Sequence, residues 1–496
     1  MPTDPRGLRG LAPALDAWLS FIESRPTPFT IPGHKHRLDL VGDVVAGDVP
    51  LYAGLDTMSQ ARGVLAAAQQ RAAALWGADV ARFSVGGSTH GNQALALAVA
   101  APGDRVVVSR TLHRSLLLGL VLAGLSPVWV SPPVDDFGMP RGITPEALAD
   151  ALAGAPDATA VFVGDPSYVG TVADIEGLAA IAHAHVRPRT RTGTEPGTGT
   201  AAGAGTGSDG IPLVVDAAWG AHFGFHPALP RHALAQGADA LVTSAHKTLP
   251  AWSQGALVLA QTRRIDAARL SAALDATATT SPSGAILASI DASRALLERD
   301  GPGLLDDLVR EVAALRERLG TVRGLTVLGG PGVDPAKVCL LLPGTGADGL
   351  HIEADLIARG MPVELADRDA IVAMVTLADT PATLRRLGDT LVELIERHRG
   401  TPRPAVASIA WSVVPQQICP PREAFFARQE TVGADLAVGR VCGELVAPYP
   451  PGIPVLAPGE LVTEATLTAL QAARSAGVRI AYAADPTLAT IRVLTE

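Results

Sequence analysis

Short apolar runs alternate with Ala- and Leu-rich stretches between about residues 60 and 283. Each run is apolar at successive positions, which is typical of a strand that is buried on both faces. Because helical stretches separate the runs, the pattern predicts a mostly parallel sheet in an α/β layer fold. The predicted strands are residues 105–109, 127–130, 160–163, 213–216 and 240–244.

The chain divides by composition into four regions. Residues 1–60 are rich in proline and glycine and predict an N-terminal arm, whereas residues 61–300 hold the predicted sheet. Residues 301–400 open with leucine and valine at helical spacing and predict a smaller α/β domain. Residues 401–496 are proline-rich and predict a C-terminal domain with one helix near 464–476. Within the large domain, the Gly/Thr-rich segment 187–210 predicts a flexible surface excursion.

Composition restricts the class of protein. With 496 residues, 48% hydrophobic and 18% charged, the chain has the balance of a multidomain globular enzyme. A net charge of −9 without a long basic run disfavours nucleic acid and anionic membranes as partners. The three cysteines form no CxxC pair, so we expect neither a disulfide framework nor a metal site. The sequence has no signal-peptide pattern and no apolar stretch of ~20 residues, which predicts a cytoplasmic protein.

Lys247 and Asp216 each stand at the end of a predicted strand. A lysine ammonium is costly to bury, so at such a place it either reaches solvent or takes part in chemistry. A desolvated lysine can form a Schiff base with an aldehyde cofactor or a carbonyl substrate. An aspartate at a neighbouring strand end is the partner that a pyridinium nitrogen requires, although it could also cap a helix. The pair therefore suggests pyridoxal phosphate (PLP).

A Gly-rich segment, GGSTHGN at 86–92, precedes a predicted helical run over residues 93–101. Small residues such as Gly87 let the backbone approach an anion, and Ser88 and Thr89 offer hydroxyls at a helix start. The segment predicts a phosphate cradle, and an ordinary Gly-rich turn with a Ser/Thr cap is the alternative. Beside Lys247 and Asp216 we favour the cradle.

Other polar residues near the predicted strand ends have two interpretations each. His113 follows the strand at 105–109 and could stack on an aromatic cofactor or cap a surface helix. Ser244 and His246 flank Lys247 and could contact a phosphate or cap a turn.

Motifs that run almost from end to end resemble one known family. They are PFTIPGHKH at 28–36, LD at 55–56, FSVGGSTHGN at 83–92, HRS at 113–115, VDAAWGAHF at 215–223, SAHKTL at 244–249, TSPS at 280–283, PREAFF at 421–426, and APYPPGIPV with PGE at 447–460. In this order they resemble the ornithine/lysine/arginine decarboxylase family of fold-type-I PLP enzymes, in its shorter form without an N-terminal wing domain. The resemblance implies a large PLP-binding domain, a smaller α/β domain and a C-terminal domain.

The resemblance also implies a role for each residue of the constellation. Lys247 would hold the PLP aldehyde as a Schiff base, and Lys247 or His246 would return a proton to the substrate. Asp216 would pair with the pyridine nitrogen, and His113 would stack on the ring. The remaining cofactor contacts would come from Gly87, Ser88, Thr89, Ser244 and His246 at the phosphate, Trp219 and His222 in the pocket, and Ser281 of a neighbouring subunit. A homodimer would then be the minimal catalytic unit.

The implied activity is α-decarboxylation of a basic amino acid, arginine or lysine before ornithine, giving agmatine or a diamine for polyamine biosynthesis. A carboxylate would bind the distal cation of the substrate, and Glu460 is the candidate by resemblance unless it is a surface residue. Two alternatives stay open: an aminotransferase or aldolase-like lyase that uses the same lysine and aspartate, and a PLP-fold regulatory protein without turnover. Departures from the family pattern at Gly284 and at residues 57–60 leave the choice of amino acid open.

Overall fold

The computed structural model describes residues 2–49, 56, 62–135, 138–187, 210–404, 413–449, 453–475 and 477–495. Most of the Gly/Thr-rich segment at 187–210 lies outside these residues, as do residue 55, residues 57–60 and residues 450–452. The chain forms two compact units, Met1–Val99 with Val214–Asp306 and Ala100–Leu213 with Asp307–Glu496. These units divide the chain at other points than the four predicted regions, which stay a prediction.

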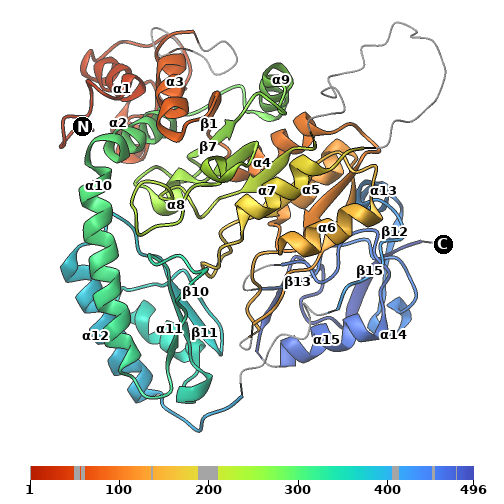
Figure 1. The fold of residues 1–496 in the computed structure, drawn as a ribbon. Helices are drawn as coiled ribbons and strands as arrows, with labels where there is room; N and C mark the ends of the chain where they lie inside the picture. Colours follow the sequence, from red (N-terminus) through yellow and green to blue (C-terminus); the bar gives the residue numbers. More distant parts are fainter. Residues whose placement is uncertain are drawn as a thin grey trace, which may run out of the picture. The chain divides into compact units, whose positions relative to one another are not determined.

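The first unit contains the end of strand β5, where Asp216 lies, and strand β6, which precedes the short helix α8 with Lys247 (Figure 1). Strands follow one another in the order β1-β7-β6-β5, with β5 and β6 parallel and β7 antiparallel to both of its neighbours. Its strands are β1 (Val80–Ser84), β5 (Leu213–Asp216), β6 (Ala240–Thr243) and β7 (Ala256–Ala260). Its helices are α1 (Pro13–Glu23), α2 (Leu38–Val41), η1 (Gly42–Val45), α3 (Val64–Trp76), α4 (Gly87–Val99), η2 (Ala233–Gln236), α8 (Ala245–Thr248), α9 (Ala267–Thr277) and the first part of α10 (Gly284–Gly320).

Helix α4 packs closely on this sheet because glycine stands at the contact. A Cβ at Gly91 would lie 2.8 Å from Val258 Cγ2 of β7 and closer still to Val242 Cγ2 of β6. Only a residue without a side chain permits this approach. The helix begins at Gly87 and not at residue 93 as predicted, because Gly87, with a φ of +69°, turns the chain from β1 straight into the helix.

A buried ion pair holds the N-terminal arm to the first unit. Arg294 Nη2 lies 2.6 Å from Asp291 Oδ1 on α10, and both side chains are fully buried. The other carboxylate oxygen of Asp291 accepts a hydrogen bond from the Ala14 N–H at 2.8 Å, in the first turn of α1. The arm is therefore tied through its backbone to the second oxygen of a carboxylate whose charge Arg294 already pairs.

The second unit has its own parallel strands in the order β4-β2-β3. Strand β2 has the predicted bounds. Strand β3 begins one residue earlier than predicted, and β4 is shifted by one residue toward the C-terminus. This part comprises β2 (Arg105–Ser109), α5 (Arg114–Ala123), β3 (Ser126–Val130), α6 (Pro145–Gly154), β4 (Val161–Gly164) and α7 (Ile175–Ala184).

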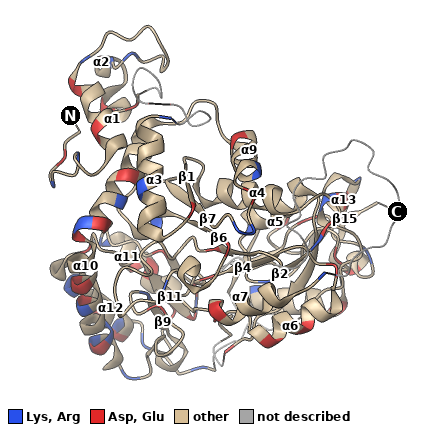
Figure 2. Ribbon diagram, turned by 45° about the horizontal axis from the view of Figure 1, so that its top comes forward, with Lys and Arg blue, Asp and Glu red and all other residues tan. Residues whose placement is uncertain are grey.

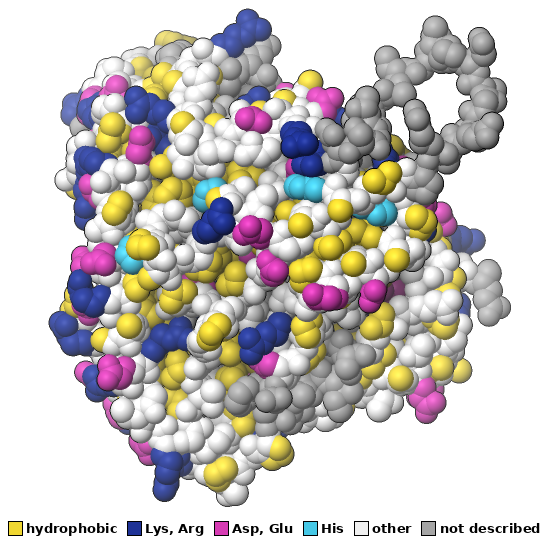
Figure 3. Space-filling model, viewed as in Figure 1, with side chains coloured by type: hydrophobic (Ala, Val, Ile, Leu, Met, Phe, Trp, Pro, Cys, Tyr) yellow, Lys and Arg dark blue, Asp and Glu magenta, His cyan; other side chains and the backbone are white. Residues whose placement is uncertain are grey.

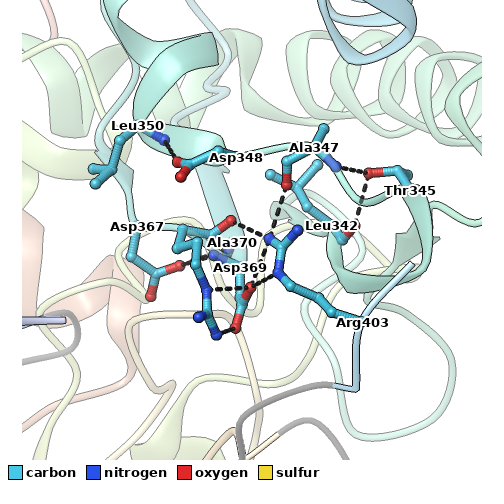
Figure 4. Close-up of polar contacts among 10 residues, drawn as sticks. Leu342, Thr345, Ala347, Asp348, Leu350, Asp367, Asp369, Ala370 and Arg403 are labelled. Carbon is cyan, nitrogen blue, oxygen red and sulfur yellow. Dashed lines mark hydrogen bonds and ion pairs between the residues drawn. The ribbon is translucent and has the colours of Figure 1, made fainter. Parts of the chain in front are cut away.

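A smaller sheet of the order β10-β11-β9-β8 follows in the same unit. It comprises β8 (Thr326–Val327), β9 (Val338–Leu341), η3 (Pro343–Thr345), α11 (Gly349–Ala358), β10 (Leu365–Ala366), β11 (Ala370–Ala373) and α12 (Pro381–Arg397). Figure 4 shows how Arg403 anchors the chain as it leaves this sheet: Nε donates to Asp369 Oδ1 at 2.8 Å and Nη2 donates to the Ala347 carbonyl at 2.8 Å. Burial would raise the pKa of Asp369, but hydrogen bonds from Arg368 and Arg403 hold it below its ordinary value.

The C-terminal region, blue in Figure 1, forms a hydrophobic core of its own. That core joins α15 to β15 and to the loop before α15, through fully buried residues such as Leu470, Ile491 and Leu456. The region comprises α13 (Pro421–Phe426), β12 (Gln429–Gly433), α14 (Ala434–Ala437), β13 (Ala447–Tyr449), α15 (Glu464–Ser475), β14 (Arg479–Ala481) and β15 (Thr490–Leu494). The helix predicted near residues 464–476 is present as α15.

Charged side chains of opposite sign alternate on the surface. On α12, Glu393 pairs with Arg397 at 2.7 Å and with Arg359 of α11's C-cap at 2.8 Å, in a charged region that is visible in Figure 2. On the face drawn in Figure 3, acidic and basic side chains are interspersed with apolar ones. None of the helices that the structure describes is both long enough and apolar enough to cross a membrane.

Candidate active site

Lys247 lies in the short helix α8, directly after β6. All four residues of β6 are buried, and the chain enters α8 through Ser244. Lys247 Nζ lies 3.9 Å from the centre of the Trp219 ring, which belongs to the turn after β5. This cation–π contact brings the amine next to the strand end that carries Asp216.

The chain contains three lysines in all. Lys35 lies in the N-terminal arm, where its Nζ donates to the Thr30 carbonyl oxygen. Lys337 is buried in the second unit, with its Nζ 3.6 Å from Met374 Sδ. Of the three, Lys247 alone directly follows a buried strand of the first unit, as the sequence predicted for a Schiff-base lysine.

Asp216 ends β5, and only 7% of the residue is exposed. Asn92 Nδ2 of α4 donates to Asp216 Oδ2 at 2.7 Å, and the Ala218 N–H donates to Oδ1 at 3.2 Å. Hydrogen bonds to both oxygens reduce the cost of burying the carboxylate and fix its orientation. Residues 217–223 form turns, so the alternative of a helix cap does not apply.

The ends of β5 and β6 are tied together beside Lys247. Thr243 Oγ1 donates to the Ala217 carbonyl at 2.8 Å, and the Ala217 N–H donates to the Val242 carbonyl at 2.8 Å. His246 Nδ1 lies 2.9 Å from the Gly255 carbonyl oxygen. The turn that presents the lysine is therefore held by hydrogen bonds on both sides.

The start of α4 contributes polar groups near Asp216. The Gly87 N–H donates to the Gln254 carbonyl at 2.8 Å, which ties the helix start to the loop before β7. Ser88 and Asn92 are four residues apart and thus lie on one face of the helix. Because Asn92 contacts Asp216, Ser88 belongs to the face of α4 that meets the β5 strand end, whereas Thr89 is exposed.

His113 is the N-cap of α5 in the second unit. Its Nδ1 accepts a hydrogen bond from the Ser115 N–H at 3.3 Å and lies 2.8 Å from Ser115 Oγ. The structure therefore has the capping role that the sequence offered as an alternative. The residue is exposed at the same time.

Three further predicted residues have distinct surroundings in the first unit. Trp219 contacts Lys247 as described, and His222 is buried with its ring 4.8 Å from that of Phe223. Ser281 is exposed in the segment between α9 and α10, where its N–H donates to Thr279 Oγ1 at 3.2 Å. The structure thus places Trp219 beside the lysine and Ser281 on the surface.

Glu460 does not have the surroundings of a substrate ligand. It is 0% exposed and forms an ion pair with Arg110, in which Nη2 lies 2.8 Å from Oε2 and Nη1 contacts Oε1. Its Oε2 also accepts the Ala457 N–H at 2.7 Å. A carboxylate whose charge is already neutralised offers little to a substrate cation, so the assignment of Glu460 as the distal ligand is withdrawn.

A family model places the chain among known proteins. The major domain of the Orn/Lys/Arg decarboxylases matches residues 12–188 and 200–344, and their C-terminal domain matches residues 406–479. The chain belongs to the Orn/Lys/Arg decarboxylase family. The match is interrupted within the Gly/Thr-rich segment, between residues 188 and 200.

Relatives of this decarboxylase match along nearly its whole length. It is 30% identical to the arginine decarboxylase of Halalkalibacterium halodurans over 98% of both chains, and 29% identical to that of Bacillus subtilis over 95% of both. It is 23% identical to the constitutive lysine decarboxylase of Escherichia coli, over 92% of this chain and 76% of that one. The chain thus matches the shorter relatives from end to end.

Solved structures share the fold of this decarboxylase. Lysine decarboxylase A from Pseudomonas aeruginosa matches with a TM-score of 0.80 at 21% identity, over 99% of this chain and 81% of that chain. The serine palmitoyltransferase of Sphingomonas wittichii matches with a TM-score of 0.53 at 14% identity, over 77% of this chain and 84% of that chain. The predicted fold-type-I architecture is confirmed, as is the prediction of a PLP-dependent amino acid decarboxylase.

The described residues fit PLP, which is the cofactor of this enzyme. Ser244 Oγ is buried and has no hydrogen-bond partner among the residues that the structure describes. A buried hydroxyl of this kind is costly unless a bound group accepts its hydrogen bond, and a phosphate oxygen is such an acceptor. Lys247 and Asp216 supply the amine and the carboxylate that the aldehyde and the ring nitrogen of PLP require.

Two residues of this decarboxylase were not given roles from sequence. Asn92 was part of a quoted motif, but its bond to Asp216 joins residues 124 positions apart. Arg110 follows the predicted strand at 105–109 directly, and its partner Glu460 lies 350 positions away. A cation straight after a buried strand was the signal at Lys247, and the same signal was present at Arg110.

Proposed function

We propose that this decarboxylase acts on arginine and releases CO₂ and agmatine. The observation that carries the proposal is that four arginine decarboxylases match at 28–30% identity over at least 90% of the chain. The lysine decarboxylases of P. aeruginosa and E. coli match at 25% and 23% over 66% and 76% of their own length. We also propose that the enzyme works in the cytoplasm and that agmatine enters polyamine biosynthesis.

When bound, PLP supplies a ring that takes up the electron pair left on the α-carbon as CO₂ departs. Lys247 Nζ would hold the cofactor through its aldehyde group. Asp216 accepts a hydrogen bond from the ring nitrogen and, as a nearby negative charge, favours a proton there. The bonds that Asn92 and the Ala218 N–H donate at 2.7 and 3.2 Å keep that carboxylate in one orientation.

The α-carbon must receive a proton after CO₂ has left. Lys247, whose amine can carry a proton, is the first proposed donor, and His246 is the second. The Gly255 carbonyl can only accept a hydrogen bond, so His246 Nδ1 carries the hydrogen that lies between them. Nε2 is therefore the atom of His246 that exchanges a proton.

The remaining predicted residues hold the cofactor in this proposal. Ser244, His246 and the start of α4, with Gly87, Ser88 and Thr89, bind the phosphate, which a helix N-terminus favours. His113 stacks on the ring, and Trp219 and His222 form part of the pocket. The buried Ser244 Oγ is the strongest support, because it lacks a partner among the described residues.

We propose a homodimer in which Ser281 of one subunit contacts the phosphate bound by the other. Ser281 is exposed, and the N-terminal arm exposes apolar side chains, with Phe29 94% and Val44 82% exposed. Apolar side chains so exposed support burial against another copy. Mixing Lys247→Ala subunits with Ser281→Asp subunits should restore one intact site per heterodimer. Light scattering that reports a monomer, or no recovery of activity in verified heterodimers, would refute this arrangement.

The substrate is tested by offering arginine, lysine and ornithine separately to purified, PLP-loaded enzyme. We expect CO₂ and agmatine from arginine at a kcat/KM at least ten times that for lysine or ornithine. A preference for another amino acid would overturn the choice of arginine. Formation of a keto acid in place of CO₂ would overturn decarboxylation itself.

A further inference from the structure

We propose that Arg110, held by Glu460, is a positioning residue that orients the turn carrying His113. The C-terminal region would then act on catalysis through this pair rather than through a substrate contact. The proposal rests on the proposed stacking role of His113, and the experiment below separates the two. Arg110, His113 and Glu460 all lie in the second unit.

The guanidinium of Arg110 is fully engaged. Besides the two contacts with Glu460, Nε donates to the Pro454 carbonyl at 3.0 Å and Nη2 donates to the Val455 carbonyl at 3.0 Å. Its planar face lies over the Trp129 ring, with Cζ 4.9 Å from the ring centre. These contacts act in the plane of the guanidinium and above it, so they define both the position and the rotation of the group.

Stability alone does not account for this pair. Arg110 is 5% exposed and Glu460 is 0% exposed, so both charges have lost nearly all contact with water. Replacement of a buried ion pair by packed apolar side chains is often neutral or stabilising. Unlike apolar packing, the pair fixes the orientation of the Arg110 side chain, because the hydrogen bonds between the two partners are directional.

Only two residues separate Arg110 from His113, and backbone hydrogen bonds hold this short segment in place. The Arg110 N–H donates to the Val130 carbonyl at 2.8 Å, and the Leu112 N–H donates to the Ser109 carbonyl at 3.2 Å. Leu112 itself is buried. His113 then begins α5 as its cap, so its ring moves with the first turn of that helix. A shift of the Arg110 backbone is therefore passed to the His113 ring.

A second arginine provides a matched control at the other end of the same helix. Arg422 of the C-terminal region donates from Nη1 to the Val121 and Leu122 carbonyls at 3.1 and 2.7 Å. It too ties the C-terminal region to α5, but at the end remote from His113. If the C-terminal region only had to stay docked on α5, removal of either arginine should lower activity. If Arg110 positions His113, only its removal should do so.

The test compares the Arg110→Met/Glu460→Met double variant with Arg422→Met, both as PLP-loaded full-length enzyme. The double variant should lose roughly 10- to 100-fold in kcat with little change in KM, because small misplacements of active-site groups have effects of this size. Its visible circular dichroism, which reports how the cofactor ring is held, should also change. Arg422→Met should keep both. Unchanged kcat and dichroism in the double variant would overturn the proposal.

A double-mutant cycle with His113→Ala separates positioning from a structural defect. If Arg110 acts through His113, the double replacement should lower kcat much less in the His113→Ala background than in the wild type. Full additivity would overturn the proposal. If His113→Ala alone leaves turnover normal, the stacking role in the proposed function fails instead. Should the double variant not fold, Glu460→Gln removes the charge at nearly constant shape and decides by the same readouts.

Discussion

Asp165 makes the stability of the second unit depend on pH. It follows β4, is buried, and accepts the Ala173 N–H at 2.6 Å through Oδ1. Burial raises the pKa of Asp165 from 3.8 to about 7, and the negative charge of Asp334 acts in the same direction. The folded state therefore keeps Asp165 protonated at pH values where the unfolded chain has released the proton.

The magnitude follows from the shift in pKa. Stability that is present below pH 4 is lost as pH rises to about 7, because over this window the folded protein binds a proton that the unfolded chain does not. At 1.36 kcal/mol per pH unit, the loss is on the order of 4 kcal/mol. Asp165→Asn removes the titration and can still accept the Ala173 N–H through its amide oxygen. The variant should therefore be more stable than wild type at pH 8 and about equal to it at pH 4.

The assay is the thermal unfolding midpoint of both proteins between pH 4 and 8, followed by calorimetry. At pH 8 the variant's transition should lie higher by on the order of 10 °C, and the difference should shrink steadily as pH falls. Asp174→Asn is the control: Asp174 is exposed and caps α7, and asparagine caps as well as aspartate. A variant no more stable than wild type at pH 8, or a gain independent of pH, would refute the argument.

Three further substitutions test particular contacts. Asn92→Ala removes the bond to Asp216 and should lower kcat/KM with arginine by roughly 10- to 100-fold, since hydrogen bonds to charged groups contribute about 1.5–3 kcal/mol; an unchanged value would contradict the orienting role. Gly91→Ala forces a methyl group against Val242 and should destabilise the protein by about 1–3 kcal/mol in denaturant titrations; an unchanged free energy of unfolding would contradict the close packing of α4 on the sheet. Arg294→Met leaves its fully buried aspartate partner unpaired and should cost about 3–5 kcal/mol by the same measurement; a loss under 1 kcal/mol would count against the buried pair.

The parallel part of the fold could be read from the sequence because each strand is a separate apolar run between helices. Strands β2 and β5 have the predicted bounds. Strand β7 was not predicted, and its antiparallel direction could not have been, since a five-residue apolar run carries no information about the direction of its partner. Strand β1 includes Arg82, which interrupts its apolar pattern and hid the strand.

In the candidate site, too, some residues could be predicted from local sequence and others could not. Lys247 and Asp216 could be singled out because each is a charged residue, unfavourable to bury, that lies next to a local apolar run. The roles of Asn92 and Arg110 depend on partners 124 and 350 positions away, and no local pattern encodes such a partner. Glu460 was a candidate by resemblance to the family, but whether a carboxylate is free or paired is decided by tertiary packing.

The proposed attachment of PLP to Lys247 can be tested directly because the chain has three lysines. Borohydride reduction of the PLP-loaded enzyme fixes the cofactor to its lysine, and mass spectrometry of the digested protein identifies the modified peptide. We predict one pyridoxyl group per chain, on Lys247. Stoichiometric modification of Lys35 or Lys337, or an unmodified Lys247 in active enzyme, would contradict the account.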